Sequence, residues 1–259
     1  MLDFLESMSE IKETIAILKA RWPEVVLIIG LDVLMMLVNK LHLWLTGIGS
    51  FLGLINLICL IALVVIIALL IVAFQRTVYI GSRKRQTPLN LLLIGKHFLW
   101  RFMGFELLFF PICWVLAWII FLVINRITPI DTSFLETAKT VPFVYYLCFA
   151  IAALILIKPL LLVFPIVIVR DCRLLESFKL LKHFRLFDAK GLVILFLVFT
   201  ALTVMWAFLP SIESEMTITQ LILRVLLSVV QSFMGLMLAV MEVRFVGSLD
   251  LSNNGMPNR

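Results

Sequence analysis

The chain of 259 residues has a formal net charge of +6, yet only 15% of its residues are charged and 63% are hydrophobic. A soluble domain uses roughly half apolar and about a quarter charged residues, so the composition excludes a water-soluble fold. The basic residues gather at the ends of apolar segments, which indicates membrane orientation and anionic lipid headgroups, not nucleic acid binding. The composition predicts an integral membrane protein.

Residues 1–24 are predicted to form an amphipathic helix that ends at Pro23. Apolar residues recur there every three or four positions, at Leu5, Met8, Ile11, Ile15, Leu18 and Trp22. Two interpretations stay open: an interfacial helix that lies on the membrane, or a docking helix for a partner protein. The segment lacks a basic region followed by an apolar stretch, so we expect no cleaved signal peptide.

Six later segments are apolar enough, and long enough at about 1.5 Å per residue, to cross a hydrocarbon core of roughly 30 Å. They are 25–46, 51–74, 102–124, 141–169, 191–210 and 216–241. Backbone groups inside lipid must be satisfied within the segment, which favours helices. The expected fold class is all-α: a polytopic integral membrane protein with six transmembrane helices over residues 25–246, amphipathic interfacial helices, and a cytoplasmic tail over 247–259.

The distribution of basic residues predicts that both termini are cytoplasmic. On the other side of the membrane the six-span layout places only Lys40, Arg126 and Lys139. The cytoplasmic side receives Lys12, Lys19, Arg21, Arg76, Arg83, Lys84, Arg85, Lys96, Arg170, Arg173, Lys179, Lys182, Arg185, Lys190, Arg244 and Arg259. This asymmetry independently supports six spans.

Two cytoplasmic loops are alike in sequence. One reads RKRQTPLNLLLIGKHFLWRFMGFELLFF and the other RDCRLLESFKLLKHFRLFDAKGLVILFL, so that the KHF of residues 96–98 falls on the KHF of residues 182–184. In both, a basic turn is expected to lead into a short amphipathic helix and then a new span. The pattern indicates either a duplicated helical hairpin or convergent use of lysine and aromatic residues at two similar interfaces.

Residues 161–199, LLVFPIVIVRDCRLLESFKLLKHFRLFDAKGLVILFLVF, combine an apolar span, a proline near its end, a polar turn, an amphipathic helix around Ser177 and Phe178, and another span. This layout resembles a broad family of bacterial and archaeal six-span membrane proteins of unassigned function. The family includes stand-alone inner-membrane proteins and the membrane domain fused ahead of some glycerophosphodiester phosphodiesterases. The resemblance implies a location in the bacterial or archaeal plasma membrane. It implies little chemistry, because a separate domain performs catalysis in the fused enzymes.

Ionisable residues inside the predicted spans are the first candidates for function, because each is costly unless it is paired or hydrated. They are Asp32, Glu106, Lys158 and Arg224, with Asn56 as a further polar residue. Lys158 is expected to form a buried pair with Glu106 or with Asp32, since a lysine stem can bridge the difference in depth.

The last span carries a polar stripe on one helical face, formed by Arg224, Ser228, Gln231, Ser232, Gly235 and Glu242. Such a face is expected to point into the bundle or into a hydrated cavity. It therefore predicts either hydrogen-bonded helix packing or a polar lining for a transported solute or lipid headgroup. Prolines at 111, 159 and 165 are expected to introduce kinks.

Catalytic and metal-binding motifs are missing from the sequence. The histidines His42, His97 and His183 lie on separate segments, the four cysteines show no paired spacing, and there is no HExxH, GxSxG, P-loop or dinucleotide fingerprint. We therefore expect no enzyme activity, no cofactor and no metal. The sequence favours a non-enzymatic scaffold or accessory subunit; the alternative is a small transporter or channel-like protein for a lipid or polar solute.

The two basic loops are expected to contact anionic lipid headgroups. The candidate residues are Arg83, Lys84, Arg85, Lys96, Arg173, Lys179, Lys182 and Arg185. Apolar neighbours, Leu91, Leu92, Leu93 and Phe98 in one loop and Leu174, Leu175, Phe178 and Leu181 in the other, are expected to sink into the headgroup region. Alternatively, the bases only enforce topology. The expected partners are membrane lipids and a protein bound through residues 1–24 or the loops, with no nucleic acid.

Overall fold

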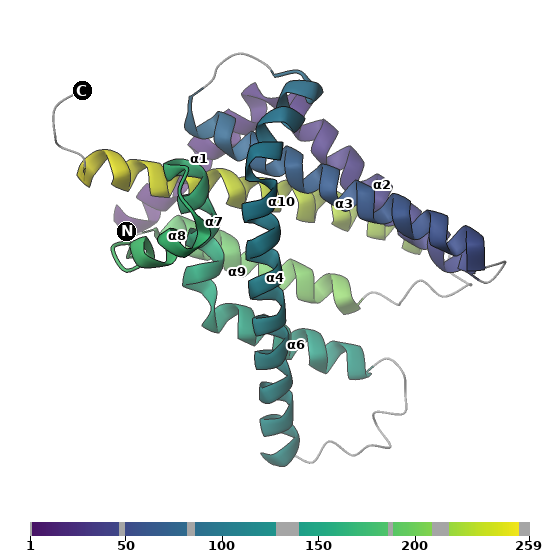
Figure 1. The fold of residues 1–259 in the computed structure, drawn as a ribbon. Helices are drawn as coiled ribbons and strands as arrows, with labels where there is room; N and C mark the ends of the chain where they lie inside the picture. Colours follow the sequence, from purple (N-terminus) through teal and green to yellow (C-terminus); the bar gives the residue numbers. More distant parts are fainter. Residues whose placement is uncertain are drawn as a thin grey trace.

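The computed structural model describes residues 2–46, 50–81, 86–127, 140–185, 189–208 and 218–253. Every regular element in these ranges is a helix, which confirms the all-α class (Figure 1). The helices are α1 (Leu2–Ala20), α2 (Trp22–Thr46), α3 (Ser50–Tyr79), α4 (Pro88–Ile127), α6 (Thr140–Ile155), α7 (Ile157–Arg170), α8 (Leu174–Leu181), α9 (Lys190–Phe208) and α10 (Ile218–Asn253).

Among the described residues, four helices contain a segment long and apolar enough to cross a membrane. These segments are Trp22–Asn39, Asn56–Tyr79, Pro88–Arg126 and Leu221–Ser248. A fifth arises if α6 and α7, which meet at a bend of 62°, count as one span. The apolar part of α9, Lys190–Val204, is shorter. The structure thus supports four to five spanning helices, and the sixth stays a prediction.

The junction between α1 and α2 corrects the prediction for Pro23. Helix α1 already ends at Ala20, and α2 begins at Trp22, so Pro23 lies in the first turn of a new helix. Proline is tolerated there because the first turn needs no backbone N–H for the helical ladder. The packed face of α1 matches the predicted stripe only in part. Leu18 is buried as predicted, and so is Thr14, which the stripe did not include. Ile15 is 43% exposed, and Trp22, which is the first residue of α2, is 55% exposed.

The two similar loops fold differently. Residues 96–98 lie inside α4, where the predicted amphipathic helix and the predicted span 102–124 form one continuous helix of 40 residues. Residues 182–184 instead follow α8, a separate helix of 8 residues. The loops share one feature, since Phe98 and Phe184 are both buried. At about 1.5 Å per residue, α4 is about 60 Å long, so it exceeds the hydrocarbon thickness and must tilt or extend beyond it.

The segment predicted as one span over 141–169 is broken at Leu156. The break separates α6 from α7, and Pro159 follows within the first turn of α7. Pro159 cannot donate a hydrogen bond to the carbonyl of the preceding turn, which explains the bend at this point. Pro165 lies inside α7, and the helix continues through it.

Three clusters of buried side chains hold the described helices together. The smallest, of Ala117, Cys148 and Ala152, joins α4 to α6. The largest joins α1, α2, α3, α4, α7, α9 and α10, with Leu18, Ile28, Phe74 and Leu192 among its fully buried members. The second is aromatic and joins α4, α7 and α8, where the ring of Phe109 stacks on Phe178 at 5.8 Å.

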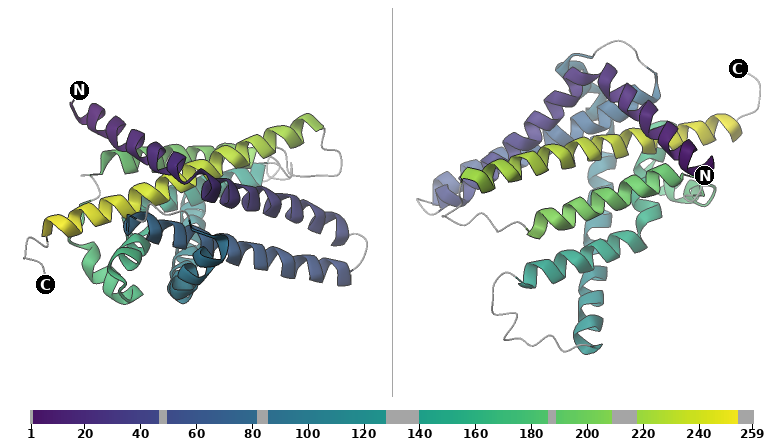
Figure 2. Two further views of the ribbon diagram at one scale, coloured as in Figure 1. Left: turned by 90° about the horizontal axis from the view of Figure 1, so that it is seen from above. Right: turned by 180° about the vertical axis from the view of Figure 1, so that it is seen from behind.

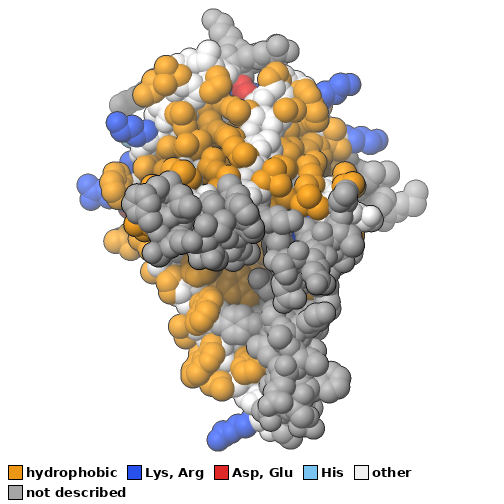
Figure 3. Space-filling view, turned by 90° about the vertical axis from the view of Figure 1, so that its right-hand side faces the viewer, with side chains coloured by type: hydrophobic (Ala, Val, Ile, Leu, Met, Phe, Trp, Pro, Cys, Tyr) orange, Lys and Arg blue, Asp and Glu red, His pale blue; other side chains and the backbone are white. Residues whose placement is uncertain are grey.

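Figure 2 shows that α1 crosses α10. Figure 3 shows a face dominated by hydrophobic side chains, with Lys and Arg near its edges.

Helices α3 and α4 approach each other closely at Gly95. A Cβ atom at this position would lie 2.3 Å from the backbone oxygen of Leu69. Only glycine allows the two backbones to come this near, a feature common where membrane helices pack. Gly95 therefore fixes the position of α4 on α3.

Candidate functional site

Polar side chains of the α10 stripe bond neighbouring helices, and the stripe is buried at Arg224 and Ser228 and half-buried at its other positions. Ser232 Oγ bonds the carboxylate of Asp32 on α2, and it also lies 2.8 Å from the carbonyl of Ser228. Gln231 Nε2 donates to Thr203 Oγ1 of α9 at 3.1 Å. Gln231 and Ser232 of the stripe therefore form hydrogen bonds with α9 and α2.

Near Glu242, at the C-terminal end of the stripe, α10 contacts α3. Gln75 Nε2 donates to the carbonyl oxygen of Ala239 at 3.3 Å and to Glu242 Oε2 at 3.4 Å. Gly235 lies against the ring of Phe199, which a Cβ atom at Gly235 would approach to 3.5 Å. Helices α2, α3 and α9 thus cover successive levels of the α10 face. Arg224 and Ser228 are buried on the same helix, at 5% and 7% exposure.

The expected ion pair of Lys158 is not formed within the described part of the chain. Asp32 bonds Ser232 instead, and no ion pair joins Lys158 to Asp32 or to Glu106. The predicted depth of Lys158 was counted along a continuous helical rise over 141–169, whereas the 62° bend at Leu156 lies directly before Lys158. Glu106 is exposed on α4, where the neighbouring Phe105 and Phe109 form the packed face.

Asn56 links α3 to α2. Its Nδ2 donates to the carbonyl oxygen of Val38 at 3.1 Å, and the side chain is 7% exposed. Asn56 is thereby satisfied by the backbone of a neighbouring helix, as a polar group inside lipid requires.

A buried polar cluster at the α1–α2 junction was not predicted. Arg21 and Glu24 are 7% and 4% exposed, with Arg21 Nη1 3.5 Å from Glu24 Oε2. The Arg21 guanidinium also bonds the hydroxyl of Thr77 and lies 5.6 Å from the ring centroid of Phe74. Burial lowers the pKa of Arg21, and the Glu24 carboxylate opposes this effect. A sequence signal did exist, since an Arg just before a helix can meet a Glu three positions later in its first turn.

The same cluster reaches the segment that leads into α4. The backbone N–H of Gln86 donates to Glu24 Oε1 at 3.1 Å. Thr77, which accepts from Arg21, is itself 3% exposed and donates to the carbonyl oxygen of Phe74 at 2.9 Å. The Arg21–Glu24 pair thus connects the start of α2 to both ends of the α3–α4 connection.

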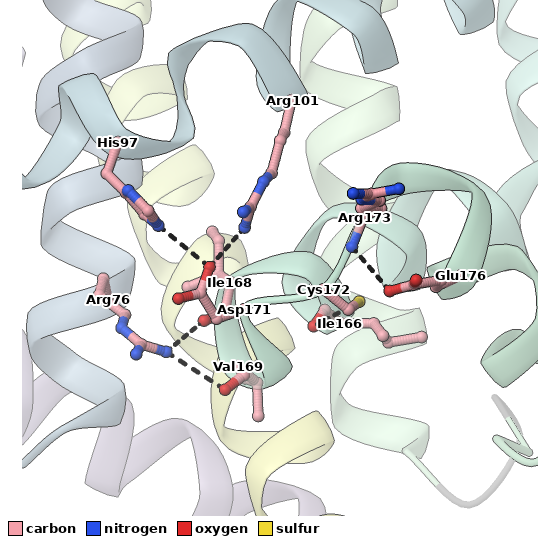
Figure 4. A network of polar contacts seen from close by, with 10 residues as sticks. All are labelled: Arg76, His97, Arg101, Ile166, Ile168, Val169, Asp171, Cys172, Arg173 and Glu176. Carbon is pink, nitrogen blue, oxygen red and sulfur yellow. Dashed lines mark hydrogen bonds and ion pairs between the residues drawn. The ribbon is translucent and has the colours of Figure 1, made fainter.

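A second unpredicted network surrounds the C-terminal end of α7 (Figure 4). Arg76 of α3 donates to the carbonyl oxygens of Ile168 and Val169, the latter at 3.2 Å. These carbonyls belong to the last turn of α7, where helical partners are missing and a cation is favoured. The Arg76 guanidinium also lies 5.7 Å from the ring centroid of Phe98. Arg76 therefore joins α3, α4 and α7.

Asp171 completes this network just after α7. It has a left-handed backbone with φ of 49°, and its carboxylate accepts hydrogen bonds from Arg101 and, at 3.1 Å, from His97. The Arg101 hydrogen bond lowers the pKa of Asp171 against the opposing effect of partial burial, and His97 adds to the lowering. His97, for which the sequence predicted no partner, thus links α4 to the end of α7.

The predicted lipid-contacting residues are only partly described. Arg83, Lys84 and Arg85 lie outside the described residues. The other bases, Lys96, Arg173, Lys179, Lys182 and Arg185, are exposed.

The apolar neighbours of these bases mostly pack inside the protein, contrary to expectation. Leu91 and Phe98 are buried, and Phe178 stacks on Phe109, because α8 and the first turns of α4 cover the bundle. The exposed apolar residues at this level are Leu89, Leu93, Trp100 and Leu175. Trp100, at 81% exposure, was not predicted, although interfacial tryptophan is typical of membrane proteins.

Within the described ranges there is no group of three or more His, Cys, Asp and Glu residues arranged for a metal ion. The chain matches no family model, no curated protein and no solved structure. The resemblance of residues 161–199 to six-span membrane proteins therefore stays a prediction, and a functional proposal has to rest on the geometry.

Proposed function

We propose that the chain is a non-enzymatic integral membrane scaffold or accessory subunit of a bacterial or archaeal plasma membrane. It has both termini in the cytoplasm and contacts anionic lipids through the exposed bases of α4 and α8. The observation that supports this proposal is the closed polar face of α10, whose side chains bond α2, α3 and α9. A solute pathway needs polar groups that face water, whereas these groups hold helices together.

The proposal has six spans, because α6 and α7 together count as one bent span and α9 counts as another. The 19 residues of α9 extend about 28 Å, close to the hydrocarbon thickness. The four long apolar helices supply the rest. An even number of spans puts both termini on one side, in agreement with the distribution of basic residues.

Topology is tested by single-cysteine labelling in intact cells with a membrane-impermeant maleimide. Cysteines at positions 131–136 and 211–215 are expected to react from outside, whereas those at 83–85 and 179–185 react only after the cells are opened. If the basic loops were labelled from outside, the orientation of the chain would be the opposite of the proposed one. The bases would then not contact the inner leaflet.

Lipid selection is tested by native mass spectrometry of the purified chain with phosphatidylglycerol, cardiolipin and a neutral lipid. We expect preferential retention of the anionic lipids, because each base near an anionic surface contributes about 1 kcal/mol. Changing Lys96, Lys179 and Lys182 to glutamine should reduce this preference. The matched control is Arg126→Gln at the far end of α4, which should leave it unchanged. Equal retention of neutral and anionic lipids by the unaltered chain would contradict the proposal.

The transporter alternative is favoured by one observation, the 62° bend between α6 and α7. Lys158 and Pro159 follow the bend directly, and helix breaks free backbone carbonyls that can bind solutes or ions. Water access to the polar face of α10 distinguishes the two functions.

A further inference from the structure

A cavity of about 390 Å³ lies where α1 crosses α9 and α10, beside the end of α3. Its polar lining comes from Glu10 and Thr14 of α1, Tyr79 of α3, and Arg244 and Ser248 of α10. The volume falls in the range of small-molecule sites, which is roughly 300 to 1,000 Å³.

The cavity lies at the level where the helices leave the hydrocarbon. Tyr79 is the last residue of the candidate span Asn56–Tyr79, and Ser248 is the last residue of Leu221–Ser248. Leu192, which also lines the cavity, belongs to the first turn of α9. Phospholipid headgroups occupy this level of a bilayer, and tyrosine is enriched there.

Both signs of charge face the cavity from different helices. Arg244 also bonds Glu13 on α1, but a guanidinium has five N–H donors and can bind a phosphate as well. The Glu10 carboxylate reaches α9, since a Cβ atom at Gly191 would lie 2.5 Å from Glu10 Oε2. A carboxylate at the wall of the cavity attracts an ammonium group and repels a headgroup that is only anionic.

The remaining wall of the cavity is apolar and includes Leu192, Met241 and Phe245. An apolar wall next to an acid and a base suits an amphiphile that carries a phosphate, an ammonium group and an acyl chain. We propose that this cavity binds the headgroup of an aminophospholipid, with the phosphate at Arg244 and the ammonium group at Glu10. The site is separate from the exposed bases of α4 and α8, and neither depends on the other.

The experiment is native mass spectrometry and thermal unfolding of the full chain with phosphatidylethanolamine, phosphatidylcholine and phosphatidylglycerol. Phosphatidylethanolamine is expected to be retained best at one site and to raise the melting temperature most, because its ammonium group donates hydrogen bonds that choline cannot. Glu10→Gln should weaken this binding about tenfold, the loss of one charge-assisted hydrogen bond. Glu176→Gln is the control, because it removes an exposed carboxylate of α8 that does not line the cavity, and it should leave this binding unchanged.

The unaltered chain alone can overturn the proposal, since equal retention of the three lipids would show that the cavity does not select an amine. If free phosphoethanolamine raised the melting temperature as much as phosphatidylethanolamine does, the ligand would not have to be a lipid, and this part of the proposal would be wrong. Glutamine variants of Lys96, Lys179 and Lys182 should alter phosphatidylglycerol retention and leave phosphatidylethanolamine binding unchanged. A variant that changes the retention of phosphatidylglycerol alone, or of phosphatidylethanolamine alone, therefore distinguishes the proposed anionic contacts from this site.

Discussion

Gly95→Ala is expected to lower the free energy of unfolding by about 3 kcal/mol or more, the upper range for an overpacked position. The new Cβ atom would lie 2.3 Å from the oxygen, 2.9 Å from the carbonyl carbon and 3.0 Å from the Cα atom of Leu69. All three atoms belong to the backbone of α3, so no side-chain rotation relieves the clash. The two helices would have to separate, which would disturb the aromatic cluster that α4 shares with α7 and α8.

The measurement is unfolding of the detergent-solubilised chain by heat or by titration with a denaturing detergent. Gly30→Ala is the matched control, because a Cβ atom at Gly30 has no atom within 4 Å and alanine is the better helix former by about 1 kcal/mol. Gly30→Ala should leave stability unchanged or raise it. Similar stability of the two variants would show that α3 and α4 do not meet at Gly95.

Arg21→Met is expected to destabilise the chain by about 3 to 5 kcal/mol, because it leaves the buried carboxylate of Glu24 without its cation. Glu24 is 4% exposed, and Arg21 is the partner that its Oε2 atom meets at 3.5 Å. The double variant Arg21→Met, Glu24→Met should recover part of the loss, since it removes both charges from the buried site.

A double-mutant cycle measures this coupling through the melting temperatures of the four proteins. Lys19→Met is the control for removing a base near the same junction, because Lys19 is exposed. Its effect should stay within about 0.5 kcal/mol. Additive losses for Arg21 and Glu24 would mean that the two side chains do not act as a pair.

Hydropathy was sufficient to predict the fold class and the segments of α2, α3 and α10. Long apolar runs can be satisfied only by helices in lipid, so 51–74 lies within α3 and 216–241 coincides with the first two thirds of α10, which continues to Asn253 in the predicted tail. Proline positions were less informative, because the residue fits both after a helix and in its first turn. Pro23 lies in the first turn of α2, although it was expected to end the preceding helix, whereas Pro159 follows a 62° bend, in agreement with the kink expected there.

The partners of polar side chains were harder to predict than their burial. The stripe of α10 was expected to point into the bundle or into a hydrated cavity, and two of its side chains bond α2 and α9. Its partners, such as Asp32 and Thr203, depend on how each helix is rotated about its axis, which a single sequence does not specify. For the same reason the ion pair predicted for Lys158 is not found among the described residues. Arg21 was counted among the flanking bases, because a buried arginine at a helix junction looks like a topological charge until its neighbours are known.

The closed polar face of α10 is tested most directly by thiol accessibility. Single cysteines at positions 228, 231 and 232 would be placed in a chain without its native cysteines, reconstituted in liposomes and exposed to a small water-soluble methanethiosulfonate reagent. Cysteine at 219, which is exposed just before the span, serves as the accessible control, and cysteine at 230 as the lipid-facing one. The closed packing predicts reaction at 219 alone until the protein is denatured. Reaction at 228, 231 and 232 in the folded protein would reveal a hydrated path along α10 and contradict the scaffold function.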